Sequence, residues 1–229
     1  MVRAFFITGT DTEVGKTTIA AGLLCAARQA GLTTAAVKPV ASGCEITAAG
    51  LRNSDALALQ AECTRKLEYA QVNPFAFAPA IAPHLAAGQA GIVLEVGALS
   101  AAVQHVLAMQ ADLTVVEGAG GWRVPLSGAA SLSDLVVALG LPVILVVGIR
   151  LGCINHALLT AEAIAADGLQ LAGWVANVVD PQTACLEDIL NTLEERLPAA
   201  CLGRVPRMAQ ATSAAVAACL DLKLLPLAR

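Results

Sequence analysis

Short runs of apolar residues alternate along the chain with longer helix-forming segments. The apolar runs are bounded by turn residues, which is typical of buried strands. Strands are predicted at residues 5–8, 34–38, 113–117, 143–147 and 171–177, with a shorter one starting at Cys201. Helices are predicted at residues 17–29, 54–60, 99–109, 132–139, 155–166, 185–196 and 213–220. This alternation predicts an α/β fold, with a doubly wound, mostly parallel sheet flanked by helices.

The domain organisation follows from what interrupts this pattern. No repeat, low-complexity tract or linker is present, so residues 1–229 are expected to form one domain. Prolines mark an irregular excursion between residues 69 and 91, and a glycine-rich stretch covers residues 118–128. Both are interpreted as loops over a functional site rather than as domain boundaries.

The composition alone would suggest a membrane protein, because 57% of the residues are apolar and only 14% are charged. The best apolar run, at residues 141–149, is nevertheless far shorter than the ~20 residues that a spanning helix needs. It is better interpreted as a central strand buried on both faces. The N-terminus lacks the pattern of a signal peptide, so we expect a cytoplasmic protein with no membrane partner.

Charge and cysteine content exclude further classes. The net charge is −4 and no basic run occurs, which disfavours a nucleic-acid groove. None of the seven cysteines forms a Cys-x-x-Cys pair, and none lies at zinc spacing with the three histidines. We therefore expect free, mostly buried thiols.

A phosphate-binding loop follows the first predicted strand, where residues 9–18 read Gly-Thr-Asp-Thr-Glu-Val-Gly-Lys-Thr-Thr. A glycine-rich turn before a helix can point several backbone N–H groups at an oxyanion, and the helix dipole adds to their field. Lys16 can reach the outer phosphates, and the Thr17 hydroxyl can bind Mg²⁺. The spacing is a variant, because Gly9 precedes Gly15 by six positions instead of five. The alternative is an ordinary turn whose lysine faces water.

Charged residues also end other predicted strands, where ligands of parallel sheets bind. Lys38 ends the second strand, and the following Pro39 keeps its backbone extended. Glu117 ends an all-apolar strand and resembles the acidic residue that holds Mg²⁺ in nucleotide sites. Each has a simpler explanation, as a solvated lysine or as one of many strand-ending acids. Asp55 could equally be a first-turn acid that the helix dipole stabilises.

Six segments together resemble the dethiobiotin synthetase family. They occur in order and with compatible spacing between residue 5 and about residue 206. They read Thr-Gly-Thr-Asp-Thr-Glu-Val-Gly-Lys-Thr at 8–17, Lys-Pro-Val-Ala-Ser-Gly at 38–43, Asn-Ser-Asp-Ala at 53–56, Val-Glu-Gly-Ala-Gly-Gly at 116–121, Leu-Gly-Cys-Ile-Asn-His at 151–156 and Gly-Trp-Val-Ala-Asn at 173–177. Only the first segment is shared widely, among P-loop NTPases.

The resemblance implies an ATP- and Mg²⁺-dependent ligase of biotin biosynthesis. It would close the ureido ring of dethiobiotin from 7,8-diaminopelargonate and CO₂, releasing ADP and phosphate. The reaction would pass through a carbamate and a carbamic–phosphoric anhydride. The resemblance also implies a homodimer with active sites at the subunit interface.

The resemblance assigns roles to three overlapping groups of residues. Catalytic roles fall to Thr12, Lys16, Lys38 and Ser42. Nucleotide-binding roles fall to Glu13, Val14, Gly15, Lys16, Thr17, Thr18, Asp55, Glu117, Asn177 and Pro206, of which Thr17, Asp55 and Glu117 would hold Mg²⁺. Substrate-binding roles fall to Thr12, Lys38, Ser42, Gly118, Gly152, Cys153 and Asn155, and the turn that carries the last three would come from the partner subunit.

One departure and three alternatives remain. No acidic residue lies near Ser213, where the family resemblance implies a contact to the nucleotide. A switch-type ATPase of the partition class would carry a second lysine early in its phosphate loop, and residues 9–14 contain none. A related amide-forming ligase would bring a glutamine-hydrolysing domain, for which this chain has no room. A pure binding module would not need the charges of Lys38, Asp55 and Glu117.

Overall fold

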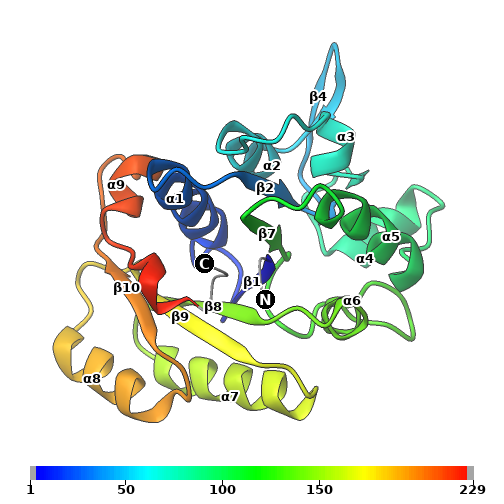
Figure 1. The fold of residues 1–229 in the computed structure, drawn as a ribbon. Coiled ribbons are helices and arrows are strands. Elements are labelled where there is room, and N and C mark those ends of the chain that lie inside the picture. Colours follow the sequence, from blue (N-terminus) through cyan, green and yellow to red (C-terminus); the bar gives the residue numbers. More distant parts are fainter. Residues whose placement is uncertain (1–3, 226–229) are drawn as a thin grey trace.

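The computed structural model describes residues 4–225, and a six-stranded sheet lies at its centre (Figure 1). The strands are arranged in the order β10-β9-β8-β1-β7-β2, and all of their pairings are parallel. Their bounds are Ala4–Gly9 for β1, Thr34–Val37 for β2, Leu113–Glu117 for β7, Val143–Ile149 for β8, Leu171–Val178 for β9 and Cys201–Val205 for β10. The predicted parallel α/β sheet is confirmed.

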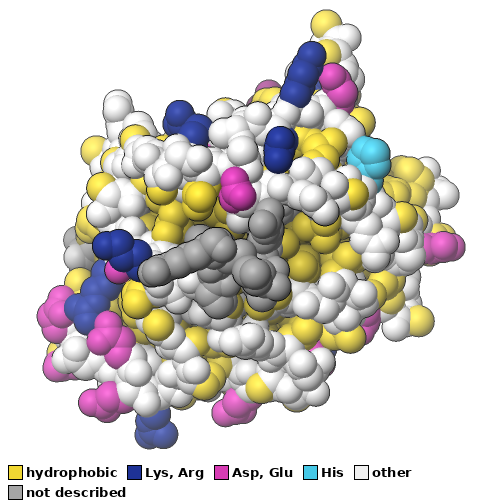
Figure 2. Space-filling view, viewed as in Figure 1, with side chains coloured by type: hydrophobic (Ala, Val, Ile, Leu, Met, Phe, Trp, Pro, Cys, Tyr) yellow, Lys and Arg dark blue, Asp and Glu magenta, His cyan; other side chains and the backbone are white. Residues whose placement is uncertain are grey.

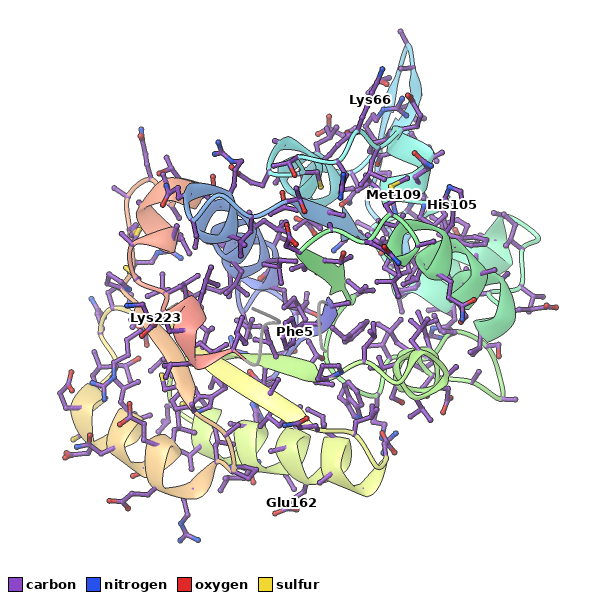
Figure 3. The ribbon with its side chains drawn as sticks, in the orientation of Figure 1. Phe5, Lys66, His105, Met109, Glu162 and Lys223 are labelled. Atoms are coloured by element: carbon purple, nitrogen blue, oxygen red, sulfur yellow. The ribbon has the colours of Figure 1, made fainter. Side chains whose placement is uncertain are left out.

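The central strands explain the high apolar content. Every residue of β1, β7 and β8 is buried, because helices cover both faces of the sheet. Strand β8 runs two residues further than predicted, to Ile149. Figure 3 labels Phe5, which is fully buried in β1 and belongs to the same apolar cluster as Ile19 and Leu23 of the covering helix α1.

Two helical layers enclose the sheet. On one face lie α1 (Lys16–Gln29) and α9 (Ser213–Ala217). On the other lie α5 (Val96–Leu107), α6 (Leu132–Leu139), α7 (Cys153–Ala166) and α8 (Leu186–Arg196) (Figure 1). Side chains such as Glu162 point outward from α7 (Figure 3). Helix α2 (Ser54–Ala61) lies along the edge of the sheet.

The segment from residue 40 to residue 91 contains more structure than its sequence predicts. The irregular excursion holds α3 (Tyr69–Val72), β6 (Phe75–Ala76) and α4 (Pro83–Gln89). Strand β6 pairs with β3 (Val40–Ala41), while β4 (Glu45–Thr47) and β5 (Gly50–Arg52) form a projecting hairpin (Figure 1). These elements span too few residues to show a hydrophobic period.

A short 3₁₀ helix, η1, lies near the C-terminus at Leu222–Leu224.

The surface in view carries charges of both signs. Figure 2 shows Lys and Arg side chains spread among Asp and Glu side chains rather than collected in one patch on this face. Within residues 4–225, no helix has both the length and the apolar character required to cross a membrane.

Trp122 fixes the glycine-rich stretch after β7 onto the core. Its ring meets Phe6 edge-on, with 6.2 Å between ring centroids, and its Nε1 donates to Asp167 Oδ2 at 2.8 Å. Arg123 pairs with the same carboxylate at 2.8 Å. The loop predicted at residues 118–128 is therefore anchored at a buried aromatic residue.

We predict that Trp122→Phe destabilises the protein by about 1–2 kcal/mol more than Trp174→Phe does. Both changes shrink a buried indole, but only Trp122 has a hydrogen-bond partner in the described part of the chain, since Trp174 Nε1 is buried without one. Urea unfolding followed by circular dichroism measures both. Equal losses would mean that the bond to Asp167 adds nothing to stability.

Candidate functional site

The phosphate-binding loop joins β1 to α1 through unusual backbone angles. Gly15 caps the helix with a φ of 87°, and a Cβ atom there would collide with the side-chain amide of Asn177. Both constraints require glycine. Glu13 also has a positive φ, of 60°, although it is not a glycine. The extra residue of this variant loop is thus accommodated partly by a left-handed glutamate, which its sequence does not predict.

Most of the predicted residues surround one cavity of about 320 Å³ at the carboxyl edge of the sheet, here named the central hollow. Its lining comes from the phosphate loop, from the segments after β2 and β7 and from the start of α2. The lining residues are Thr12, Glu13, Gly15, Lys16, Thr17, Thr18, Lys38, Ala41, Ser42, Asp55, Glu117, Ala119 and Gly120. Sequence segments more than a hundred residues apart therefore meet here.

Glu117 is the centre of the polar contacts in the central hollow. The residue is fully buried, and its Oε1 accepts from Lys38 Nζ at 2.6 Å and from Thr17 Oγ1 at 2.7 Å. Lys38 Nζ also contacts Asp55 Oδ2 at 3.0 Å. One buried carboxylate thus links the end of β7 to the end of β2 and to the first turn of α1.

The two lysines of the hollow are in opposite electrostatic environments. Burial acts to lower the pKa of Lys38, but the charges of Glu117 and Asp55 outweigh it and raise that pKa above its usual value. Burial lowers the pKa of Lys16 to about 8, and Glu117 opposes this only in part. Lys16 Nζ donates to the backbone carbonyl of Asp11 at 2.9 Å. A bound polyanion would favour the charged form of Lys16.

The oxygen atoms in the hollow fit a magnesium ion. Glu117 Oε2 is buried without a hydrogen-bond partner among residues 4–225, and Thr17 and Asp55 line the same cavity. The described residues hold no cluster of three or more His, Cys, Asp and Glu side chains suited to a metal. A hydroxyl and two carboxylates suit Mg²⁺, which normally keeps several waters and binds substrate phosphates besides a few protein oxygens.

A second cavity of about 200 Å³, here named the side hollow, adjoins the first. It shares three residues with the central hollow and extends to the ends of β9 and β10. It is lined by Glu13, Gly15, Thr18, Asn177, Val178, Val179, Val205, Pro206, Arg207, Met208 and Ala211. Asn177 Nδ2 donates to the carbonyl of Val14 at 2.8 Å, which fixes this strand end to the phosphate loop.

Ser213 has an acidic partner that is distant in sequence. Its hydroxyl donates to Glu62 Oε1, and Glu62 Oε2 accepts from Arg28 at 3.2 Å. The contact joins α9 to the end of α2 and to α1. No acid lies near Ser213 in the sequence, but the fold places one beside it.

The predicted substrate residues after β8 lie apart from both hollows. Gly152 has a φ of 92° and is exposed, as is Asn155. The Cys153 side chain is buried, and its N–H donates to the carbonyl of Arg150 at 3.0 Å. Arg150 Nη2 meets Asp11 Oδ2 at 2.8 Å, which connects this turn to the phosphate loop.

Gly118 also lies outside the lining of the central hollow. It is buried, its N–H donates to the Ile7 carbonyl, and a Cβ atom would approach the Phe6 ring to 2.8 Å. Close packing explains this glycine. Conversely, the sequence analysis missed Ala41, Ala119 and Gly120 as lining residues. Their signals are that they lie in the family segments 38–43 and 116–121, two or three residues after a charged residue that ends a predicted strand.

Comparisons with known proteins agree with these features. A family described as "AAA domain" matches residues 3–215. The ATP-dependent dethiobiotin synthetase BioD of Pseudomonas aeruginosa (strain UCBPP-PA14) is 73% identical over 220 residues, covering 96% of each chain. The proteins of the same name from Chromohalobacter salexigens and Cellvibrio japonicus are each 58% identical, covering 92% and 96% of both chains.

Solved structures support the fold alone. A ParA family ATPase from Chlorobium tepidum superimposes with a TM-score of 0.57 at 15% identity, covering 99% of this chain and 94% of that one. Such low identity does not favour the switch-type alternative over the far closer relatives. The agreement in sequence over nearly the whole length is decisive, and this chain belongs to the ATP-dependent dethiobiotin synthetase family.

Proposed function

We propose that residues 1–229 act as one catalytic unit that converts 7,8-diaminopelargonate, CO₂ and ATP to dethiobiotin, ADP and phosphate. The observation that carries this proposal is the central hollow, where two lysines and two carboxylates surround a phosphate-binding loop. The seven cysteines are all free thiols, which supports a cytoplasmic site of action.

The chemical problem is the approach of two negatively charged groups. A carbamate, formed from one substrate amine and CO₂, must attack the γ-phosphorus of ATP with loss of ADP. Neutralising this charge is the main task of such a site. Lys16, at the start of α1, would hold the outer phosphates. Lys38, directly after β2, would stabilise the charge of the carbamate and the transferring group.

The resulting carbamic–phosphoric anhydride is then attacked by the second amine. Its nitrogen forms the new C–N bond while phosphate leaves, which closes the five-membered ureido ring. Thr12 and Ser42 both line the hollow and would donate hydrogen bonds to the carbamate and the substrate. These bonds would hold the second amine near the reacting carbon.

Mg²⁺ would be held by Thr17, Asp55 and Glu117. When bound, it supplies positive charge to the phosphate oxygens. Glu13, Val14, Gly15 and Thr18 would bind the phosphates through the loop and the first helical turn. The side hollow would receive the adenine, with Asn177 and Pro206 at its edge.

We further propose a homodimer in which the turn after β8 completes the neighbouring subunit's site. Gly152, Cys153 and Asn155 would bind the substrate carboxylate, and Gly118 would lie beside the substrate. The exposed Leu151, at 94% of its full accessible surface, supports a partner on this turn. The Cys153 N–H already donates to the Arg150 carbonyl, so the next amides in the first turn of α7 would meet the anion.

Phosphate release should require both 7,8-diaminopelargonate and bicarbonate. Each contributes atoms that must be in place before phosphoryl transfer. A coupled assay for inorganic phosphate, with each substrate omitted in turn, measures this dependence, and mass spectrometry identifies dethiobiotin. Equal phosphate release without the diamine would instead favour a switch-type ATPase.

Lys16→Ala and Lys38→Ala should fail differently. Loss of Lys16 should weaken ATP binding by about tenfold to a hundredfold, the value of a charge-assisted hydrogen bond, and reduce turnover as well. Loss of Lys38 should mainly lower kcat, because the charge it meets develops during transfer. Nucleotide titration and steady-state kinetics separate the two effects. The same loss of ATP affinity in both variants would refute the role of Lys38.

Mixing two inactive variants tests the shared site. Lys38→Ala and Asn155→Ala chains should each be nearly inactive, because each damages every site. Random pairing gives about half mixed dimers, each with one intact site, so activity should recover to roughly a quarter of the unmutated level. If activity fails to recover although subunit exchange is confirmed, Asn155 does not act in its partner's site.

A further inference from the structure

Lys38 occupies the space between the oxygen atoms that would bind Mg²⁺. Its Nζ lies 2.6 Å from Glu117 Oε1 and 3.0 Å from Asp55 Oδ2. The third candidate ligand, Thr17, donates its hydroxyl to the same Oε1 at 2.7 Å. The ammonium therefore takes the bridging position between two carboxylates that a divalent cation would otherwise take.

The Lys38 backbone is fixed by contacts on both sides. Its N–H donates to the Val72 carbonyl at 2.7 Å, and its own carbonyl accepts from Asn73 Nδ2 at 2.8 Å. The following Pro39 removes a further rotation. Any response of Lys38 to an arriving cation must therefore come from rotation of its side chain.

An ammonium and a magnesium ion bound to these same two carboxylates would lie close together. Mg²⁺ binds oxygens at 2.0–2.1 Å, so an ion held by Glu117 and Asp55 would lie next to Nζ. The two positive charges would repel each other strongly in a buried site, where screening by water is weak. Asp55 is the more exposed of the two carboxylates, and Glu117 Oε2, buried without a partner among the described residues, keeps its lone pairs free for the metal.

We propose that Lys38 is a built-in substitute for the metal: Mg²⁺ displaces its ammonium from Glu117 and Asp55, and this displacement releases Lys38 toward the reacting groups. The competition follows from the contacts alone, while the catalytic meaning of the release rests on the proposed function. In the absence of metal, the lysine keeps buried Glu117 and the partly exposed Asp55 paired. Once metal is bound, the freed charge becomes available to the carbamate.

Metal binding without nucleotide tests the competition. Lys38→Met keeps the length of the side chain and removes its charge, so Mn²⁺, a spectroscopic substitute for Mg²⁺, should bind about tenfold or more tightly than to the unmutated protein. The free Mn²⁺ signal in electron paramagnetic resonance measures the affinity. Lys16→Met is the matched control, because it removes one charge from the same hollow while its Nζ contacts the Asp11 carbonyl. It should change Mn²⁺ affinity much less.

A second measurement uses the unmutated protein and does not depend on the folding of Lys38→Met. A pulse of an amine-acetylating reagent, read by peptide mass spectrometry, should modify Lys38 more with Mg²⁺ than without it. Lys66, which is exposed and lies at the outer edge of the view in Figure 3, is the internal reference. Unchanged labelling of Lys38, or equal gains in Mn²⁺ affinity for both variants, would overturn the proposal. Neither result would alter the substrate dependence of phosphate release, which tests the function separately.

Discussion

The buried carboxylate of Glu117 is the interaction on which the rest of the site depends. A carboxylate with no solvent exposure is costly unless other groups neutralise it, and here Lys38 and Thr17 do so directly. Glu117 ends β7, Lys38 follows β2 and Thr17 is in α1, so the pairing also fixes these three elements relative to one another. The charge that makes the site chemically useful therefore also holds the elements of the sheet edge in place.

Parallel topology explains how residues from distant parts of the sequence form one site. Because β1, β2 and β7 are neighbours with one direction, the segments that follow them meet at one edge. Strand β8 can be entirely apolar, since helices on both faces exclude water. Apolar content and polar chemistry are thus separated: the strand bodies are buried in the core, and charged side chains such as Lys38 and Glu117 lie at strand ends.

Sequence reasoning recovered the sheet and its long helices, because apolar runs leave clear patterns. It recovered most of the lining of the central hollow from the phosphate loop, from charged strand ends and from the family resemblance. It missed strands β3 to β6 and the short helices α3 and α4. Helix α4 has seven residues, α3 has four and the strands have fewer, which is too few for a hydrophobic period to appear. It could not find the partnership of Ser213 with Glu62, since the contact joins residues that only the fold brings together. Nor does any sequence pattern predict the left-handed Glu13.

The two hollows are built from different parts of the sheet. Strands β1, β2 and β7 supply the central hollow, whereas the ends of β9 and β10 supply most of the side hollow. Substitutions at residues 205–211 can therefore reshape the wall of the side hollow without disturbing a single contact of Glu117. If this hollow receives the base as proposed, nucleobase preference could be redesigned there while the charged contacts around Glu117 stay as they are.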